Sequence, residues 1–390
     1  MEIVTLHKLQ FPSQTEQYMK HVFLFGTLCW NKLLQRVAGE TCPQGHAAVL
    51  EGFQASWAKG HNFPAIHRLD ARSASGILLC DCDANVLARL DHYESGFGYC
   101  LHRVQVQGPT GLLQAEVYLP PEGILAGNTW SLKDWVRDNG ALVYEAAEEV
   151  MAVFGHMKAD EMALAYPMML MRADARLKAR EHPAPASQSG LTHSDVTVHQ
   201  LKQPYTKFFA LQEADISVPS FDGGQIHQVN RAAFLGTDAA IVLPYDPKTD
   251  RVLLVEQFRF GPFLRGDPNP WLTEPIAGRI DVGENPEVTA IREAKEEAGL
   301  LIRKLHKVHS GYVSPGLSTE YFNVFVGIAD IGDDAAILGG LESESEDIQG
   351  HIFPFTDFLN LLKSGRLPVV PLALAGYWLA LNRNELRKNS

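Results

Sequence analysis

Two short stretches decide the fold of the second half of this chain: GRIDVGE at residues 278–284 and REAKEEAGL at residues 292–300. Pro286 and Glu287, between them, suit the first turn of a helix. Gly299 suits its end, because glycine adopts positive φ at little cost. Apolar residues recur between these limits at helical spacing. The pattern therefore predicts a loop, a helix and a second loop.

Three carboxylates of the predicted helix, Glu293, Glu296 and Glu297, stand at positions i, i+3 and i+4. This spacing puts them on one face of the helix, where they repel one another if nothing lies between them. A hard dication such as Mg²⁺ relieves that repulsion and takes oxygen ligands. A solvated acidic helix face is the alternative interpretation. We expect a metal site that faces solvent.

The same stretches resemble the signature of the Nudix family. A glycine leads, Glu284 follows after five residues, Arg292-Glu293 after seven more, and Ala294, Glu296-Glu297 and Gly299-Leu300 complete the match. The resemblance implies an α/β/α sandwich. It further implies that Mg²⁺, or Mn²⁺, is bound by three carboxylates and one carbonyl, those of Glu293, Glu296, Glu297 and Ala277. The residues implied to hold the loop and helix in place are Gly278, Glu284, Arg292 and Gly299.

Flanking residues from about 222 to 371 resemble the ADP-ribose pyrophosphatase branch of that family. A proline, Pro315, lies 15 residues beyond Leu300, and QFR at residues 257–259 follows a predicted strand. The resemblance implies hydrolysis of ADP-ribose, or a related nucleotide sugar, to AMP and ribose 5-phosphate. The implied substrate-binding residues are Arg231, Arg259, Ser314 and Pro315. Ala232 departs from the branch, which has glutamate there.

Glu344 matches the loop glutamate that takes a proton from the attacking water in this branch. Its segment, residues 342–347, is by composition only a mobile acidic loop. A flexible glutamate of this kind swings over the metals when substrate closes the loop. Arg259, taken alone, is equally typical of a surface salt bridge.

The first half carries a second pair of motifs, FLFGTL at residues 23–28 and LDHYE at residues 90–94. They resemble the γ-glutamylcyclotransferase-like, or AIG2-like, family over about residues 20–120. The resemblance implies a mixed barrel in which backbone N–H groups of Gly26, Thr27 and Leu28 bind substrate and Glu94 acts as acid and base. Phe25 departs from the usual tyrosine. An ordinary turn and a solvated glutamate are the alternatives.

Length and linker composition predict two domains in the 390 residues. Residues 1–180 form the first domain, with a helical extension from about residue 132. Residues 181–195, rich in proline, alanine, serine and glycine, form a linker. Residues 196–390 form the Nudix domain. This order of domains also resembles bacterial proteins linked to tellurite resistance, a link that the residues do not explain chemically.

Composition limits the classes of partner that we expect for this chain. The net charge of −12 argues against a nucleic-acid binder, and no stretch reaches membrane-spanning length. We expect a cytoplasmic protein with a small-molecule nucleotide-sugar substrate. We also expect a homodimer through residues 196–234, which match the segment that related pyrophosphatases use for subunit exchange. Two alternatives stay open: a sensor that binds ADP-ribose without cleaving it, and a γ-glutamylcyclotransferase regulated by the Nudix domain.

Overall fold

The computed structural model describes residues 20–333, 338–340 and 346–388. It divides into two compact units that meet between Pro167 and Met168, inside helix α5 (Ala159–Glu181). The residues that follow α5 are exposed, and the linker placed at 181–195 stays a prediction. In the described ranges, no helix is both long enough and apolar enough to cross a bilayer.

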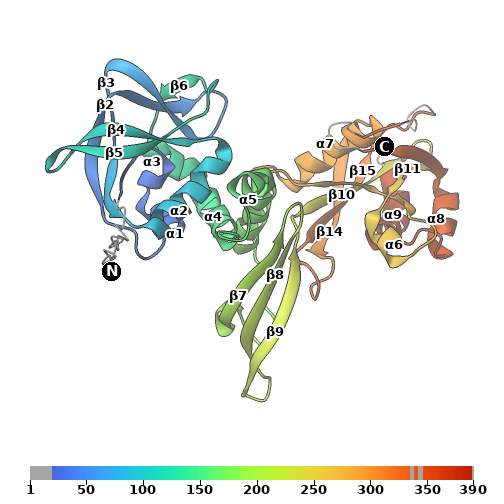
Figure 1. The fold of residues 1–390 in the computed structure, drawn as a ribbon. Helices are drawn as coiled ribbons and strands as arrows, with labels where there is room; N and C mark the ends of the chain where they lie inside the picture. Colours follow the sequence, from blue (N-terminus) through green and yellow to red (C-terminus); the bar gives the residue numbers. More distant parts are fainter. Residues whose placement is uncertain (1–19, 334–337, 341–345, 389–390) are drawn as a thin grey trace, which may run out of the picture. The chain divides into compact units, whose positions relative to one another are not determined.

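The first unit contains a closed barrel of five strands (Figure 1). The strand order is β3-β1-β5-β4-β2, and the pairing of β2 with β3 closes the ring, while β6 adds to β2. The expected mixed barrel is therefore confirmed. The strands are β1 (Lys20–Leu24), β2 (Gly45–Ala58), β3 (Pro64–Cys82), β4 (Cys100–Gly108), β5 (Gly111–Leu119) and β6 (Ala126–Thr129).

Helices accompany the barrel. A 3-10 turn follows β1, and Asp83 caps the start of α2, where its side chain accepts a hydrogen bond from the Val86 N–H at 2.8 Å. The helical extension expected from about residue 132 is also present, as three α-helices with a π-helical turn after the first. The helices are η1 (Thr27–Cys29), α1 (Asn31–Ala38), α2 (Ala84–Glu94), η2 (Ser95–Phe97), α3 (Leu132–Trp135), η3 (Val136–Gly140), α4 (Ala141–Ala152) and α5.

The second unit is built on a seven-stranded mixed sheet. Its main path is β12-β11-β10-β15-β14, with β13 paired to β10 and β16 paired to β11. Strand β10 runs parallel to β15 and antiparallel to β11 and β13. The strands are β10 (Ala239–Asp246), β11 (Arg251–Phe258), β12 (Trp271–Glu274), β13 (Ile276–Arg279), β14 (Lys304–Tyr312), β15 (Tyr321–Ile328) and β16 (Gln349–Pro354).

Strand β10 shows why this sheet needs helices on both faces. All of its residues are buried, and successive side chains point to opposite faces. Ile241 and Leu243 pack with helices α8 (Phe355–Lys363) and α9 (Val370–Lys388). Val242 packs on the other face with helix α7 (Pro286–Ala298). The expected α/β/α sandwich is confirmed.

A separate three-stranded antiparallel sheet precedes the sandwich. Strands β7 (Thr197–Thr206), β8 (Ala210–Pro219) and β9 (Gln225–Leu235) lie side by side (Figure 1). Many of its large apolar side chains are exposed, so the sheet contributes little to the core of this unit. Those at least 45% exposed are Val198, Leu201, Tyr205, Ile226 and Phe234.

Candidate active site

Helix α7 carries the predicted carboxylates, and its ends have the expected caps. The Asn285 side chain accepts a hydrogen bond from the Val288 N–H at 2.9 Å, and Gly299 ends the helix at φ 63°. The buried face is lined by small residues such as Ala290 and Ala294, whereas Val288 and Ile291 are exposed. Helical spacing of apolar residues thus identified the helix but not its buried face.

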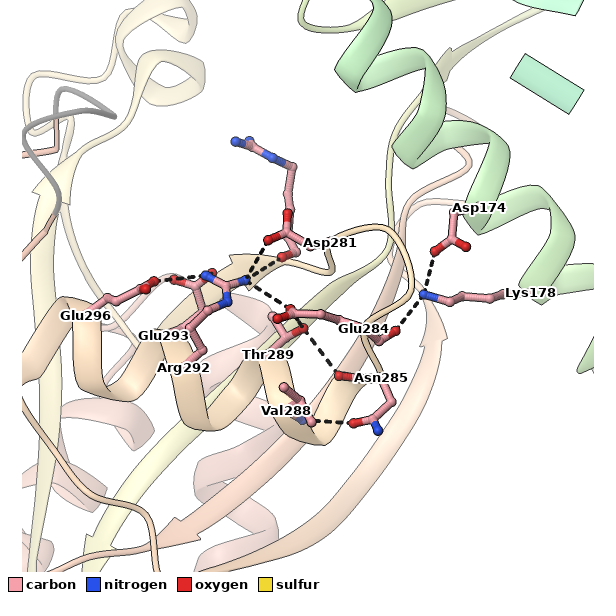
Figure 2. Close-up of polar contacts among 11 residues, drawn as sticks. Asp174, Lys178, Asp281, Glu284, Asn285, Val288, Thr289, Arg292, Glu293 and Glu296 are labelled. Atoms are coloured by element: carbon pink, nitrogen blue, oxygen red, sulfur yellow. Dashed lines mark hydrogen bonds and ion pairs between the residues drawn. The ribbon is translucent and has the colours of Figure 1, made fainter. Parts of the chain in front are cut away.

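Arg292 organises the first part of the site (Figure 2). Its Nη1 donates to Glu293 Oε1 at 2.8 Å and to Glu296 Oε2 at 2.9 Å. Its Nη2 donates to Glu284 Oε2 and to the Arg279 carbonyl, both at 3.3 Å. One guanidinium therefore ties the helix to the loop before it. Through these contacts it also brings Glu284, Glu293 and Glu296 together.

The loop is held from a second side by helix α5, which the sequence did not indicate. Lys178 Nζ donates to the Glu284 carbonyl at 2.8 Å and pairs with Asp174 at 2.6 Å (Figure 2). Thr289 Oγ1 donates to the Glu284 carboxylate at 2.8 Å. Although burial opposes ionisation, hydrogen bonds from Thr289 and Arg292 hold the pKa of Glu284 below its usual value. The Asp174–Lys178 pair looks like any i, i+4 helix pair in the sequence, which gave no signal of this contact.

Glu297 occupies the most buried position of the three carboxylates. Its residue is 3% exposed, and its Oε2 has no hydrogen-bond partner in the described part of the chain. Burial, reinforced by the charges of Glu293 and Glu346, raises the pKa of Glu297 to about 9. Burial likewise raises the pKa of Glu293 to about 7. The expectation that this site faces solvent was wrong for Glu297, because helix α7 turns that side chain inward.

Two glycines allow the backbone to approach these carboxylates closely. A Cβ on Gly278, in β13, would overlap the Glu293 carboxylate. A Cβ on Gly339 would overlap the carbonyl of Glu297. The leading glycine of the signature, Gly278, is therefore required because a larger residue would clash with the Glu293 side chain. Gly339 has the same kind of role, which the sequence did not reveal.

The donor set around α7 fits a hard divalent cation. Glu293, Glu296 and Glu297 offer only carboxylate oxygens, and the backbone of Ala277 lies in β13 next to Gly278. A buried carboxylate that lacks a partner is the kind of group that a cation stabilises. Among the described residues, no three His, Cys, Asp or Glu side chains converge as a ready ligand set, and Arg292 donates hydrogen bonds to Glu293 and Glu296.

The described residues that flank the acidic loop lie beside α7. Gly339 pairs with Ile348 in an isolated antiparallel bridge, and the Gly340 N–H donates to the Glu296 carbonyl at 3.3 Å. Glu344 lies outside the described residues, so its catalytic role stays a prediction. Glu346 is described, and its charge raises the pKa of both Glu293 and Glu297.

Arg259 follows the end of β11. Its Nε donates to Glu274 Oε1 at 2.7 Å, and the Glu274 side chain is only 10% exposed. The positive charge of Arg259 lowers the pKa of Glu297, which shows that it lies within electrostatic range of the carboxylate site. A salt bridge is present, as one interpretation expected, but it stands beside the carboxylates and not at a remote surface.

The Ser314–Pro315 turn is joined to the three-stranded sheet. The carbonyl of Ser314 accepts hydrogen bonds from Leu317 and Ser318, each at 2.9 Å, and the Phe234 N–H donates to the Leu317 carbonyl at 2.9 Å. Arg231 is exposed on β9, where its Nη1 donates to the Asn230 carbonyl at 2.9 Å. This hydrogen bond is local to β9 and does not join Arg231 to the α7 carboxylates of its own chain.

In the first unit, Gly26 of the first motif and Tyr99, five residues beyond Glu94, both lie against Pro64. A Cβ on Gly26 would lie 2.8 Å from Pro64 Cγ, and Tyr99 Oη donates to the Pro64 carbonyl at 2.9 Å. Burial raises the pKa of Glu94, at the end of α2, to about 7. The charge of Glu94 in turn helps to raise the pKa of Tyr99 and of Tyr166 on α5. Tyr166 had no signal in the sequence, since it belongs to the helical extension.

Comparisons with known families and proteins agree with both motif sets. The NUDIX domain family matches residues 236–372, and the family described as gamma-glutamyl cyclotransferase, AIG2-like, matches residues 22–137. An ADP-ribose pyrophosphatase of Escherichia coli (strain K12) is 34% identical over 194 residues, which cover 50% of this chain and 92% of that protein.

Two further relatives match the same half. An ADP-ribose pyrophosphatase of Haemophilus influenzae is 33% identical over 200 residues, covering 51% of this chain and 92% of the relative. A GDP-mannose pyrophosphatase of Escherichia coli (strain HS) is 32% identical over 160 residues, covering 41% of this chain and 82% of the relative. With its carboxylate helix intact, the chain belongs to the Nudix hydrolase family and is a Nudix pyrophosphohydrolase that carries an AIG2-like domain in its first half.

Proposed function

We propose that the chain hydrolyses the diphosphate of ADP-ribose to AMP and ribose 5-phosphate. The observation that carries this proposal is the buried Glu297 carboxylate, which lacks a hydrogen-bond partner in the described chain and lies beside Glu293. The names of the Escherichia coli and Haemophilus influenzae relatives supply the substrate. A pure sensor of ADP-ribose, the alternative, has no need of three retained carboxylates.

Mg²⁺ or Mn²⁺ would be held by Glu293, Glu296 and Glu297 together with the carbonyl of Ala277. When bound, such a cation neutralises the diphosphate and lowers the pKa of a coordinated water. Arg292 donates hydrogen bonds to two of these carboxylates. It therefore offsets their mutual repulsion, and its contacts with Arg279 and Glu284 keep the helix aligned with the preceding loop.

A glutamate of the acidic loop accepts the proton of the attacking water, a role worth about 10²–10⁴ in rate. Glu344 is our candidate, and Glu346 provides a matched comparison in the same loop. We expect Glu344→Gln to lower kcat by about 10²-fold or more and Glu346→Gln to lower it by less than about tenfold. The reverse order, measured at saturating Mg²⁺, would transfer the role to Glu346.

Substrate is held on the phosphate side by Arg259, whose guanidinium lies within electrostatic range of Glu297. Ser314 and Pro315 form the turn that contacts the other side of the nucleotide. Arg231 contributes from the three-stranded sheet. Because Ala232 replaces the usual glutamate, the grip on the base is weaker in this chain, and the preferred nucleotide is open to test.

A substrate panel tests the proposal. The full chain, with Mg²⁺, is assayed on ADP-ribose, GDP-mannose, ADP-glucose and NADH, and products are identified by chromatography. We expect the highest kcat/KM on ADP-ribose, with AMP and ribose 5-phosphate in equal amounts. A preference for GDP-mannose would assign the substrate named for the Escherichia coli (strain HS) relative. Binding of ADP-ribose without turnover at any metal concentration would favour the sensor.

We further propose that the chain is a homodimer through the sheet β7–β9. The exposed apolar side chains of this sheet support that assembly, because a second copy would remove them from water. Arg231 would then serve the site of the partner subunit. Light scattering should give twice the mass of one chain. Leu201→Lys, on β7, should give a monomer, whereas Leu381→Lys, which is also exposed and lies on α9, should leave the dimer intact.

The half-buried Glu94, with its raised pKa, favours a second activity for the first unit. A carboxyl group whose pKa is about 7 can both donate and accept a proton near neutral pH. It would shuttle a proton from the attacking amine of a γ-glutamyl compound to the departing one, with Gly26, Thr27 and Leu28 binding the substrate. Release of 5-oxoproline from a γ-glutamyl panel, lost in Glu94→Gln, would support this activity. If the wild type turns over no γ-glutamyl compound of the panel, only a binding role would remain for the first unit.

A further inference from the structure

A cavity lies in the Nudix unit, apart from the carboxylates. Its volume is about 380 Å³, within the range of small-molecule sites. It is formed by the β10–β11 turn, the start of β14, the end of β15 and the second half of α9. Its lining residues include Lys248, Arg303, Lys304, His306, Trp378 and Glu385.

The sheet separates this cavity from the candidate active site. Helix α7 packs with Ala290 against Val242, on one face of β10. Helix α9 packs with Leu379 against Ile241, on the opposite face. A ligand in the cavity beside α9 would therefore not touch the α7 carboxylates.

One wall of the cavity is cationic in a chain whose net charge is −12. Lys248 and Arg303 share one acidic partner, Asp330, at 3.2 Å and 2.9 Å. Lys304 follows directly in the sequence and adds a third cation to the lining. Three cations against two carboxylates, Asp330 and Glu385, leave one positive charge in excess, and a phosphate is the small anion that such a cluster binds well.

Another wall is aromatic. The rings of His306 and Trp378 lie 6.0 Å apart, inclined by 39°. The Asn382 side chain donates to the Trp378 carbonyl at 2.8 Å and fixes that turn of α9. Burial lowers the pKa of His306, the charge of Lys304 lowers it further, and the charge of Glu385 raises it. The aromatic pair therefore lines the cavity together with the cations and the Glu385 carboxylate.

We propose that this cavity binds a mononucleotide. The phosphate is bound by Lys248, Arg303 and Lys304, the base packs on His306 and Trp378, and the exocyclic amine of an aminated base donates to Glu385. Each part of the ligand has a matching group in the lining of the cavity. This site is independent of the proposed hydrolysis.

Calorimetric titration of the full chain with AMP, without Mg²⁺, tests the site. AMP should bind in the wild type and equally in Arg259→Ala, which weakens any binding beside α7. Lys304→Gln should weaken it about 5-fold to 10-fold. Lys307→Gln, an equally exposed lysine of β14 outside the cavity, should not change it. Asp330→Asn should tighten binding about threefold, because it frees Lys248 and Arg303.

Competition titrations test how much each part of the ligand contributes to binding. Adenosine and inorganic phosphate should each bind at least about tenfold more weakly than AMP. Inorganic phosphate binding as tightly as AMP would overturn the nucleotide assignment. AMP binding that disappears in Arg259→Ala and is unaffected by Lys304→Gln would overturn the site itself. The substitutions change side chains that are exposed or half-exposed. Thermal melts of each variant confirm that the compared proteins are folded.

Discussion

The two units each hold carboxylates whose pKa is raised by loss of solvent, but in different surroundings. In the first unit, Glu94 is a single carboxylate whose charge acts on several tyrosines, and burial raises its pKa to about 7. In the second, Glu297 lies beside other acidic groups, and burial with their charges raises its pKa to about 9. Both ionised forms are therefore disfavoured in the absence of a partner, and more strongly so in the second unit.

The comparison teaches what each site needs. A single buried carboxylate reaches a stable state by taking up one proton, which suits it to proton transfer near neutral pH. A cluster around Glu293 and Glu297 is better stabilised by a dication, which neutralises several oxygens at once. The first unit is therefore expected to act without metal and the second with it.

The largest effect is expected from Glu297→Gln. It removes a charged oxygen from the metal set, and we expect kcat to fall by at least about 10²-fold, since cation stabilisation of the transition state is worth several kcal/mol. Mg²⁺ should raise the Tm of the wild type and have little effect on this variant. Glu287→Gln, in the exposed first turn of the same helix, is the control. Near wild-type turnover in Glu297→Gln would remove the metal assignment.

A comparable loss is expected from Gly278→Ala. The added methyl overlaps the Glu293 carboxylate, and a displacement of about 1 Å at a reacting centre costs about 10²-fold in rate. Overpacking should also lower the free energy of unfolding by about 1–3 kcal/mol. Gly261→Ala, whose Cβ meets nothing within 4 Å, should alter neither. Steady-state kinetics and urea unfolding of both variants measure these two effects. Equal rates and equal free energies of unfolding in Gly278→Ala and Gly261→Ala would contradict the prediction.

A smaller effect is expected from Lys178→Met. The change keeps the aliphatic stem and removes the hydrogen bond to the Glu284 carbonyl, which should cost about 1 kcal/mol of stability. We expect kcat to fall about 3-fold to 10-fold because the loop before α7 loses its second support. Lys295→Met, an exposed lysine on α7 itself, serves as the control. If both variants retain full kcat, α5 has no part in positioning the site.

The smallest effect on hydrolysis is expected from Glu94→Gln, which should leave pyrophosphohydrolase turnover unchanged. The free energy of unfolding of the first unit should change instead. The folded pKa, about 7, exceeds the unfolded value of 4.5, so the folded first unit is most favoured below pH 4.5 and loses stability as pH rises to about 7. Glutamine does not ionise, so this loss should disappear.

Hydrogen exchange of β1 and α2 in urea, at pH 5 and pH 8, measures that response. We expect Glu94→Gln to gain on the order of 2–3 kcal/mol relative to wild type at pH 8 and little at pH 5. The same gain at both pH values would mean that ionisation of Glu94 is not the cause. A change in pyrophosphohydrolase turnover would show that the two units are coupled.

Much of this protein could be predicted from local sequence. The spacing of Glu293, Glu296 and Glu297 depends only on the 3.6-residue turn of a helix, and the caps at Asn285 and Gly299 depend only on neighbouring residues. Strands such as β10 are apolar throughout because both faces of the sheet are covered. The two families also follow from short motifs, so the amino-acid sequence alone was enough to identify both halves.

Only the tertiary structure decided which groups those motifs meet. The burial of Glu297, the contact of Lys178 with the loop, and the close approach of Gly339 to α7 join segments far apart in the chain. The cavity between β14 and α9 arises in the same way. Helical and strand periods are local properties of the backbone, whereas burial and the pKa shifts that it causes depend on how distant segments pack, which no single stretch of sequence encodes.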